Sequence, residues 1–374
     1  MKILCLDVET TTYNKGNPFD PRNNLVSVVI YDGTTFKEWY KDFTGLDEEL
    51  RSADLLIGFN VKFDLHWLNA IGIDTSVLTL WDCQYVEYLL SAQQWKYPSL
   101  DETAKRYEVG HKIDIIKSEY WDKGIDTLDI PPDLLLEYNK EDVRLTWDIY
   151  QLQKNILSDA QVNLFYVHMA DIHVIIEMER NGLLFNVSGS LEKASELECE
   201  ADKEVEWLRQ TAGGDWFDPA SNDHLSALLY GGVIVEERRL PVGTYKTGAR
   251  MGQARFKVMK VDHTLPRLIE PLKNTEYKKG GVWSTDESIL LSLPTSNLTR
   301  KIKDAILKLR GINKLCSTYL RGIPKVISNM NWYNNTIHST LNNCSTTTGR
   351  LSSTKPNQQN FDKETKQFIV SRYD

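Results

Sequence analysis

The sequence has no long uninterrupted hydrophobic segment. A membrane-spanning helix needs roughly 18 or more consecutive apolar residues, and no such run occurs among the 374 residues. The N-terminal residues also lead straight into a strand-like segment, without the charged and apolar regions of a secretory signal peptide. These absences exclude a membrane-spanning protein and favour a cytoplasmic one.

Cysteine is both scarce and scattered. The number of cysteines is odd, and no two of them form a C-x-x-C pair. A disulfide-stapled domain needs an even set of cysteines, and structural zinc sites usually need closely spaced ones. We therefore expect neither a disulfide framework nor a zinc site. All five residues are interpreted as reduced thiols: Cys5, Cys83, Cys199, Cys316 and Cys344.

Positive charge is sparse in the first part of the chain. Residues 1–155 carry 16 Lys and Arg against 27 Asp and Glu, whereas residues 156–374 carry 28 against 25. The hydrophobic content of 41% is ordinary for a globular protein, and the length predicts two or three domains. An acidic first part can hold a metal-dependent site, and a mildly basic second part can face a polyanion.

The most informative feature of the acidic part is a strand with two carboxylates near its far end. Ile3–Val8 is an apolar run typical of a buried strand, and Asp7 and Glu9 project from the same face of it. Neighbouring buried carboxylates repel each other and are costly to desolvate, and a divalent cation such as Mg²⁺ or Mn²⁺ relieves both effects. A single Asp-x-Glu also arises by chance in a chain of this length, so the motif alone is weak.

The pattern around this strand predicts an α/β domain with a mixed sheet. Short apolar, β-branched runs alternate with helical patterns, and Asp32-Gly33 is a hairpin turn signal. Ser99 or Asp101 is the expected cap of one helix. The expected elements are strands Leu4–Thr10, Leu25–Tyr31, Thr35–Trp39 and Asp54–Phe59, and helices Leu46–Ala53, Trp81–Leu90, Ser99–Tyr107 and Pro132–Ile156.

Two more acidic signals follow along the chain. Asn60, Phe63 and Asp64 lie at a strand-to-helix junction, where α/β proteins commonly form their sites, and Asn60 also suits a helix cap. Tyr138 and Asp142 are four residues apart, so they share one face of the last expected helix. Each pattern alone also fits an ordinary amphipathic helix.

The three acidic signals together resemble the DEDD exonuclease superfamily in its tyrosine-bearing, proofreading form. In chain order they are Asp7-x-Glu9, Asn60-x-x-Phe63-Asp64 and Tyr138-x-x-x-Asp142. The resemblance implies an RNase H-like fold for residues 1–155 and 3′–5′ exonuclease activity. The residues that it makes catalytic are Asp7, Glu9, Asp64, Tyr138 and Asp142.

The same resemblance implies roles for individual side chains. The four acids would bind two Mg²⁺ or Mn²⁺ ions, with Asp7 bridging them, and Tyr138 would orient the attacking water. At its unperturbed pKa near 10, the Tyr138 hydroxyl is a donor and a poor base at neutral pH. The residues expected to contact the single-stranded 3′ end of DNA are Thr10, Tyr13, which would stack on a base, Asn60 and Phe63.

The second half of the chain resembles the polymerase region of family A, bacterial polymerase I-like DNA polymerases. Five segments carry the resemblance in the family's order. They are Met178–Leu183 (ME-x-x-G), Phe217–Ser221 (FNPxS), Ser284–Glu287 (ST-x-E), Leu309–Tyr319 (KL-x-x-TY) and Thr348–Asn360 (TGRLSSxxPNLQN). Gln358 and Phe361-Asp362 depart from the family pattern at the last segment, where Leu and Ile-Pro are usual.

This resemblance implies a mainly helical connector and thumb over residues 156–335, with a hairpin-like insertion at 233–281, and the beginning of a palm at 336–374. Arg300–Lys325 carries eight basic residues and one acid, which suits contact with DNA phosphates. The residues expected to contact primer-template DNA are Lys314, Arg350, Asn357 and Gln359.

The family's later polymerase segments, among them the DYSQIE strand and the HDE hairpin, do not occur in the sequence. We therefore expect DNA synthesis to need a C-terminal polymerase polypeptide, because of either a split gene or a truncation. Unpaired palm strands would otherwise expose an edge. A viral source, with the protein in the host cytoplasm, fits this arrangement.

Two other functions fit part of the pattern. One is a stand-alone DEDD-type exonuclease that acts on RNA, against which the thumb and TGRLSS segments argue. The other is a non-catalytic DNA-binding subunit, against which the intact set of acids argues. A comparison of DNA and RNA digestion separates the first from the proofreading function, and a metal-dependent nuclease assay separates the second.

Overall fold

The computed structural model describes residues 1–112, 115–278, 280–294 and 296–372. The chain divides into two compact units, of which the first joins Met1–Val187 to Ile323–Asp374 and the second is Ser188–Gly322. Six residues of the expected segments lie outside the described part: Ile113 and Asp114 of residues 1–155, Lys279 of the insertion, Thr295 of the expected thumb region, and Tyr373 and Asp374 of the expected palm.

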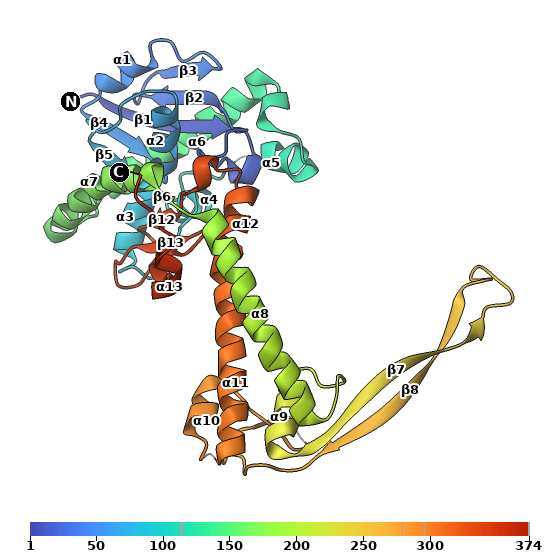
Figure 1. Cartoon of the computed structure of the whole chain (residues 1–374). Helices are drawn as coiled ribbons and strands as arrows, with labels where there is room; N and C mark the ends of the chain where they lie inside the picture. Colours follow the sequence, from blue (N-terminus) through green and yellow to red (C-terminus); the bar gives the residue numbers. More distant parts are fainter. Residues whose placement is uncertain (113–114, 279, 295, 373–374) are drawn as a thin grey trace. The chain divides into compact units, whose positions relative to one another are not determined.

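The first unit is built on a five-stranded mixed sheet with the strand order β3-β2-β1-β4-β5 (Figure 1). Strands β1, β2 and β3 are antiparallel, whereas β4 and β5 run parallel to β1. The predicted α/β class with a mixed sheet is confirmed. The sheet strands are β1 (Ile3–Thr10), β2 (Leu25–Tyr31), β3 (Phe36–Tyr40), β4 (Leu55–Gly58) and β5 (Leu80–Asp82).

Helices surround this sheet and complete its core. Helix α6 packs against β1 and β2, and α2 contacts β1, β4 and β5. These helices are α1 (Leu46–Arg51), α2 (Val61–Ala70), α3 (Cys83–Leu90), α4 (Leu100–Arg106), α5 (Ile115–Glu119), α6 (Pro132–Gln153) and α7 (Asp159–Asn181), with short 3-10 turns η1 (Tyr13–Lys15), η2 (Trp121–Lys123) and η3 (Thr127–Asp129).

One predicted helix boundary is wrong at its start. Residues Leu80–Asp82 are a strand rather than the beginning of the helix expected from Trp81, because they pair in parallel with Leu56–Gly58. The helix itself begins at Cys83, and Asp82 caps it by accepting a hydrogen bond from the Gln84 N–H. A three-residue apolar strand and the first turn of a buried helix look alike in sequence, and long-range pairing decides between them.

The unit boundary falls later in the chain than residue 155. Helix α7 contacts α2, α3 and β5, and its apolar side chains Phe165, Met169 and Ile172 belong to the core around the sheet. The chain also returns to this unit after residue 322, where Thr336–Ile337 pairs antiparallel with Leu183–Leu184. These apolar and backbone contacts place residues 156–187 and 323–335 with the sheet.

The remaining elements of the first unit are short. They are β6 (Leu183–Leu184), α12 (Gly322–Asn329), which begins at the unit boundary, η5 (Tyr333–Asn335), β11 (Thr336–Ile337), β12 (Thr340–Asn342), β13 (Ser352–Thr354), η6 (Gln358–Asn360) and α13 (Lys363–Lys366). Strands β12 and β13 form a two-stranded antiparallel sheet. Phe361, which departs from the family pattern, is buried in this segment.

The second unit is mainly helical and carries a long two-stranded ribbon. Strands β7 and β8 pair antiparallel along their whole length, so the predicted hairpin is confirmed. The elements are α8 (Val187–Ala212), α9 (Asn222–Tyr230), β7 (Gly232–Thr244), β8 (Ala254–Leu265), β9 (Glu276–Lys278), β10 (Val282–Trp283), α10 (Glu287–Ser292), α11 (Asn297–Lys314) and a π-helical turn η4 (Leu315–Leu320).

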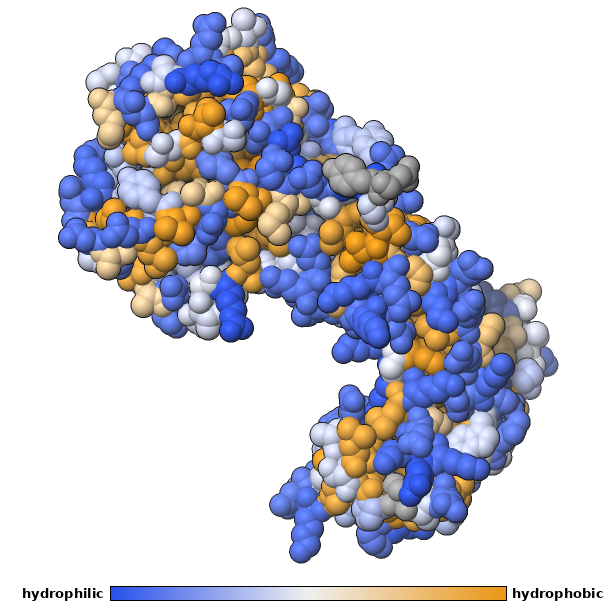
Figure 2. Space-filling view, turned by 60° about the vertical axis from the view of Figure 1, so that its left-hand side comes forward, coloured by the Kyte–Doolittle hydropathy of each residue, from blue (hydrophilic) through white to orange (hydrophobic). Residues whose placement is uncertain are grey.

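Within the described residues, no helix is both long enough and apolar enough to cross a membrane. Figure 2 shows mostly hydrophilic residues on the visible face, with hydrophobic residues scattered among them.

Candidate functional site

The acidic site begins on β1, whose face toward α6 carries Asp7 and Glu9. Residues two apart in a strand share a face, so Cys5 lies on the same face as the two acids. The Cys5 thiol donates to the Val143 carbonyl of α6 at 3.4 Å, which shows that this face of the strand meets α6. The strand therefore directs both carboxylates toward the helix that carries the other half of the expected motif.

Helix α6 presents Tyr138 and Asp142 to the strand. Pro132 starts the helix, because proline suits its first turn, and the four-residue spacing puts both side chains on one face. Both are buried, with exposures of 4% and 2%. Burial raises the pKa of the Tyr138 hydroxyl, and Asp142 is close enough for its charge to raise it further. The Tyr138 ring packs edge-on against Trp121 at 5.8 Å. The phenol is therefore held in place by the protein.

Asp64 comes from the first turn of α2 and is also buried. Its Oδ1 accepts a hydrogen bond from the Val8 N–H at 3.2 Å, which ties α2 to the strand between Asp7 and Glu9. The strand-to-helix junction thus places the fourth acid beside the first two, as the spacing suggested.

Asn60 does not cap α2 with its side chain, contrary to one interpretation of the sequence. Its backbone is left-handed, with φ of 62°, and its side chain makes no capping hydrogen bond. Asp82, at the end of β5, accepts from the N–H groups of Asn60 and Val61 at 2.9 and 3.2 Å. Tertiary packing supplies this cap, so local sequence could not reveal it.

The structure brings three of the expected metal ligands very close together. Asp7, Glu9 and Asp142 each offer a carboxylate oxygen, and these three atoms lie within 4.8 Å of one another. Asp64 falls outside this tight group but is close enough for its charge to interact with Asp7.

Burial and mutual repulsion change the acidity of these groups. Burial, with the charge of Asp142 adding to it, raises the pKa of Asp7 to about 8. Burial raises the pKa of Asp142 to about 6, against the opposing effect of Lys112. The pKa values of Glu9 and Asp64 are raised well above their ordinary values, mainly by burial and then by Asp7.

Lys112 is the site residue that sequence reasoning missed. Its ammonium forms an ion pair with Asp142 and lies 4.8 Å from the centre of the Tyr138 ring. Burial alone would lower the pKa of Lys112, but the charges of Asp142, Tyr138 and Asp7 outweigh it and raise the pKa. The residue lies in a connecting segment outside every recognised motif, so no sequence signal marked it.

The donor set suits a divalent cation. Carboxylate oxygens are the ligands that Mg²⁺ and Mn²⁺ prefer. One buried oxygen, Asp142 Oδ1, has no hydrogen-bond partner among the described residues and is available as a ligand. A cation would also counter the repulsion that raises the pKa values of these acids. The residues present therefore fit the metal that the sequence predicted, although a single lysine already neutralises part of the charge.

The residues expected to contact the 3′ end lie around the acids in different ways. Thr10 is buried at the end of β1, and its hydroxyl donates to the Thr11 carbonyl at 3.1 Å. Tyr13 is about half exposed, with the Arg22 guanidinium 4.7 Å from its ring centre. Gly16, with φ of 67°, fits between Thr10 and Phe63, where a Cβ atom would come within 2.4 Å of Thr10 Oγ1. This turn holds the Phe63 ring beside the strand.

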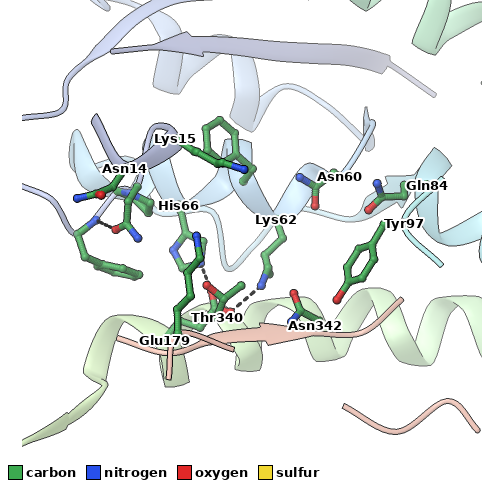
Figure 3. A pocket seen from close by; sticks show the side chains of 15 residues that line it. Asn14, Lys15, Asn60, Lys62, His66, Gln84, Tyr97, Glu179, Thr340 and Asn342 are labelled. Carbon is green, nitrogen blue, oxygen red and sulfur yellow. Dashed lines mark hydrogen bonds and ion pairs between the residues drawn. The ribbon is translucent and has the colours of Figure 1, made fainter. Parts of the chain in front are cut away.

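A cavity of about 300 Å³ lies next to these residues and is shown in Figure 3. Asn60 and Phe63 line it on α2, directly before Asp64, so the cavity adjoins the acidic site. Its wall combines aromatic rings, amides and cationic side chains from segments far apart in the sequence. The lining residues are Asn14, Lys15, Asn17, Pro18, Phe19, Asn60, Lys62, Phe63, His66, Gln84, Tyr97, Glu179, Thr340, Asn342 and Lys355.

One wall of this cavity is a buried ionic network centred on Glu179 of α7. Glu179 accepts from Lys62 Nζ at 2.6 Å and from the His66 ring at 2.5 Å (Figure 3). It also accepts from the Leu341 N–H at 2.5 Å. Lys62 also donates to the Leu341 carbonyl at 2.6 Å. Glu179 therefore joins α2, α7 and β12 at a single carboxylate.

Burial and hydrogen bonding have opposite effects on the pKa values of Glu179 and His66. Burial alone would raise the pKa of Glu179, but the hydrogen bonds and charges of His66 and Lys62 outweigh it and lower the pKa. Burial lowers the pKa of His66, against the opposing effect of Glu179. The carboxylate is therefore ionised at neutral pH.

Three of the expected DNA contacts cluster in one short segment of the first unit. Arg350, Asn357 and Gln359 are exposed there. The Asn357 side chain accepts from the Ser353 hydroxyl at 3.0 Å and from the Gln359 N–H at 3.2 Å, so it also has a structural role. The fourth, Lys314, is exposed at the end of α11 in the second unit.

The basic stretch Arg300–Lys325 is less available to a ligand than its composition indicated. Lys308 pairs with Glu204 at 3.0 Å, and Arg321 pairs with Glu198 at 2.5 Å. Arg310 donates to the Thr285 backbone carbonyl and side chain. At least three of the eight basic side chains thus hold the second unit together.

The following family model and relatives, which match this chain, are all DNA polymerases. The sequence profile of DNA polymerase family A matches residues 252–372. DNA polymerase I of Rhizobium leguminosarum is 26% identical over 82% of this chain, and DNA polymerase DpoZ of Acinetobacter phage SH-Ab 15497 is 22% identical over 98% of it. These alignments cover 26% and 56% of the two relatives.

A solved structure shows the same fold. The POL domain of Pol1 from M. smegmatis, in complex with DNA primer-template and dNTP, matches 99% of this chain with a TM-score of 0.68 and 17% identity. The match covers 55% of that chain, so this chain spans about half of the known domain. By the profile, the relatives and the shared fold, the chain is similar to family A DNA polymerases.

Proposed function

We propose that the first unit is an RNase H-like 3′–5′ exonuclease that removes nucleotides from the 3′ end of DNA, as the proofreading part of a family A DNA polymerase. The observation that carries the proposal is the convergence of Asp7, Glu9 and Asp142, whose ligand atoms lie within 4.8 Å of one another, with Asp142 buried and the other two half-buried. Asp64 and Tyr138 adjoin this group. The family relationship supplies the substrate class.

The chemistry is divided among the chain's own residues and bound metal. Asp7, Glu9, Asp64 and Asp142 would hold two divalent cations, which lower the pKa of water and stabilise charge on the departing 3′ oxygen. Burial raises the pKa of Tyr138, so its hydroxyl stays protonated at neutral pH and orients the attacking water. The Lys112 ammonium beside Asp142 is placed to offset the negative charge of a phosphate entering the site.

The adjoining cavity supports a path for the last nucleotides of a single strand. Aromatic side chains such as Phe19, Phe63 and Tyr97 offer faces on which bases stack, and Lys15 and Lys355 offer charge for phosphates. Asn60 and Gln84 bring amides to the same wall. A single strand threaded along this cavity would bring its 3′ end toward Asp64 and the acidic site.

DNA synthesis is a separate proposal. The chain spans about half of the matched polymerase domain, and the later polymerase segments are not in its sequence. We propose that polymerisation requires a C-terminal polymerase polypeptide, joined or separate, that completes the palm begun by β12 and β13. Mixing this chain with such a polypeptide and assaying primer extension tests this proposal; the proposal fails if the mixture extends no primer although both components are folded.

The nuclease proposal is tested by digestion of a 5′-labelled single-stranded DNA in Mg²⁺ or Mn²⁺. Asp7→Ala and Asp142→Ala should each reduce digestion by orders of magnitude, and Tyr138→Phe should reduce it less. A matched control is Glu137→Gln, which removes a carboxylate exposed on the same helix, 70% by side chain, next to Tyr138.

The outcomes separate the possible functions. Full digestion by Asp7→Ala would remove the acidic site from the proposal. Digestion of RNA in preference to a DNA of the same sequence would favour an RNA-processing exonuclease. Binding of DNA without any metal-dependent digestion by the folded wild-type chain would favour a non-catalytic subunit.

A further inference from the structure

The ribbon β7–β8 of the second unit has an unusual charge. Its outer part, residues 238–260, contains seven Lys and Arg and no Asp or Glu, in a chain whose net charge is −8. At its inner end, Arg238 pairs with Glu236 at 2.8 Å and Lys260 with Glu237 at 3.5 Å. Five basic side chains remain without an acidic partner within 4 Å in the described part of the chain: Arg239, Lys246, Arg250, Arg255 and Lys257.

The outer ribbon also lacks a packing partner. Ile234 and Leu265 at its base are buried against the unit, and α9 contacts β7 there. From Glu237 to Lys260 every residue is exposed except Tyr245, which is half-buried. Figure 1 shows the two strands extending beyond α9 within this unit. An isolated two-stranded ribbon is marginal in water, so contact with a ligand would stabilise it.

Basic side chains occur on both faces of the ribbon. Directly opposed residues share a face, and Leu240 opposes Lys257 while Arg239 opposes Val258. The first pair and the second pair lie on alternate faces, because residues 239 and 240 are neighbours in one strand. Both faces of the ribbon therefore repel a cationic ligand, and either face can bind an anionic one.

We propose that this ribbon binds the sugar-phosphate backbone of duplex DNA without sequence preference. The inference rests on the proposed DNA-directed function of the chain, and it concerns a surface remote in sequence from the nuclease motifs. The strand segments of the outer ribbon, residues 238–244 and 254–260, extend roughly 23 Å at about 3.3 Å per residue. They therefore match about 7 base pairs at the 3.4 Å spacing of phosphates along one strand.

Duplex fits the ribbon better than a single strand does. Proteins that bind single strands stack bases on several aromatic rings, and the outer ribbon has only Tyr245 and Phe256. A two-stranded ribbon also has the width to enter a DNA major groove. Cations on both faces of a narrow ribbon with few aromatic rings thus favour the phosphates of a duplex.

The test measures binding of a fluorescein-labelled 30-base-pair duplex in EDTA, which prevents digestion, as a function of salt. One variant changes the five unpaired basic residues to Gln. Each phosphate contact contributes about 0.9 to the slope of log K against log salt, so the slope should fall by roughly 3 to 4. The affinity at 0.1 M salt should fall at least roughly tenfold.

A second variant separates charge from folding. It replaces residues 238–259 by Asn-Gly, which joins the paired residues Glu237 and Lys260 through a two-residue hairpin turn and keeps the buried base. It should lose the same affinity as the five-Gln variant. The matched control changes five exposed basic residues that already have acidic partners: Arg51→Gln, Lys105→Gln, Lys123→Gln, Arg180→Gln and Lys193→Gln.

The outcomes decide the proposal. Unchanged duplex affinity and salt slope in both ribbon variants would overturn it, and would leave the ribbon as a docking surface for a protein. A larger loss on a 30-nucleotide single strand than on duplex would overturn the choice of duplex. Digestion of a short single strand is measured in parallel: if wild type digests nothing but the ribbon variants lose duplex binding, the nuclease proposal falls and this one stands.

Discussion

Replacement of Glu179 by Gln tests the buried network that joins α2, α7 and β12. Gln has nearly the same shape as Glu and can still accept from the Leu341 N–H. It carries no charge, so it loses the attraction to Lys62 and the charge-assisted hydrogen bond from His66. The Lys62 ammonium, with a side chain only 13% exposed, is then left without its carboxylate.

The expected cost follows from the number of bonds lost. Hydrogen bonds to charged groups contribute about 1.5–3 kcal/mol each, and removal of one partner of a buried ion pair typically costs about 3–5 kcal/mol. The lysine retains partial access to water and the Leu341 carbonyl as a partner. We therefore expect the free energy of unfolding of the first unit to fall by about 3 kcal/mol, which lowers its Tm by roughly 6–12 °C.

The assay is urea unfolding followed by tryptophan fluorescence and circular dichroism. The matched control is Glu177→Gln on the same helix, where the carboxylate is 61% exposed and pairs, among the described residues, with Arg180 at 3.0 Å. Surface pairs contribute about 0–1 kcal/mol, so this control should be nearly neutral. Adding Lys62→Met to Glu179→Gln should recover part of the loss, because no uncompensated charge then remains.

The pH dependence gives an independent check. The pKa of Glu179 lies below its ordinary value of 4.5 in the folded protein, so the ionised carboxylate stabilises the fold above pH 4.5. That contribution is lost as the pH falls through the lowered folded pKa. The difference between wild type and Glu179→Gln should therefore shrink below pH 4.5. A cost below 1 kcal/mol at pH 7, or one equal to that of Glu177→Gln, would refute the reasoning.

Two further substitutions probe the first unit. Lys112→Met removes the ammonium beside Asp142 and should lower the thermal midpoint of unfolding in EDTA. The loss should be smaller in Mn²⁺, because a bound cation replaces the missing positive charge. Equal losses in both buffers would contradict the metal assignment. Gly33→Ala places a Cβ atom 2.5 Å from Trp147 at φ of 94° and should cost about 2–4 kcal/mol in urea unfolding. The control is Gly45→Ala, where φ is 80° and, in the described part of the chain, no atom beyond the adjacent residues lies within 4 Å of the added Cβ. It has the same backbone strain without the clash, so it should lower the free energy of unfolding less than Gly33→Ala does. Equal losses would mean that Trp147 moves aside freely.

Local sequence was sufficient for most elements. Leu25–Tyr31 is a strand with the predicted ends, and Ser99 caps α4 in a reciprocal box with Glu102. Helix α7 begins with a reciprocal box between Ser158 and Gln161. These features depend on side-chain alternation and on hydrogen bonds within three residues, which are written directly in the sequence.

The candidate site divides in the same way. The acids on β1, α2 and α6 were marked by spacing, because strand and helix periods determine which side chains share a face. Lys112 was not marked, because it reaches Asp142 from a connecting segment with no period to follow. Asp82 was not recognised as the cap of α2, since the N–H groups that it accepts belong to residues more than 20 positions earlier.

The sequence by itself determined strands β1 to β4 of the sheet, which acids share a face, and that the ribbon is cationic. Tertiary structure alone decided that α7 belongs with the sheet, that Glu179 meets Lys62 and His66, and that three basic side chains of residues 300–325 have internal partners. The physical reason is the distance along the sequence over which each effect acts. Backbone propensity and side-chain periodicity act over a few residues, whereas burial and ion pairing depend on residues more than 100 positions apart, such as Lys62 and Glu179.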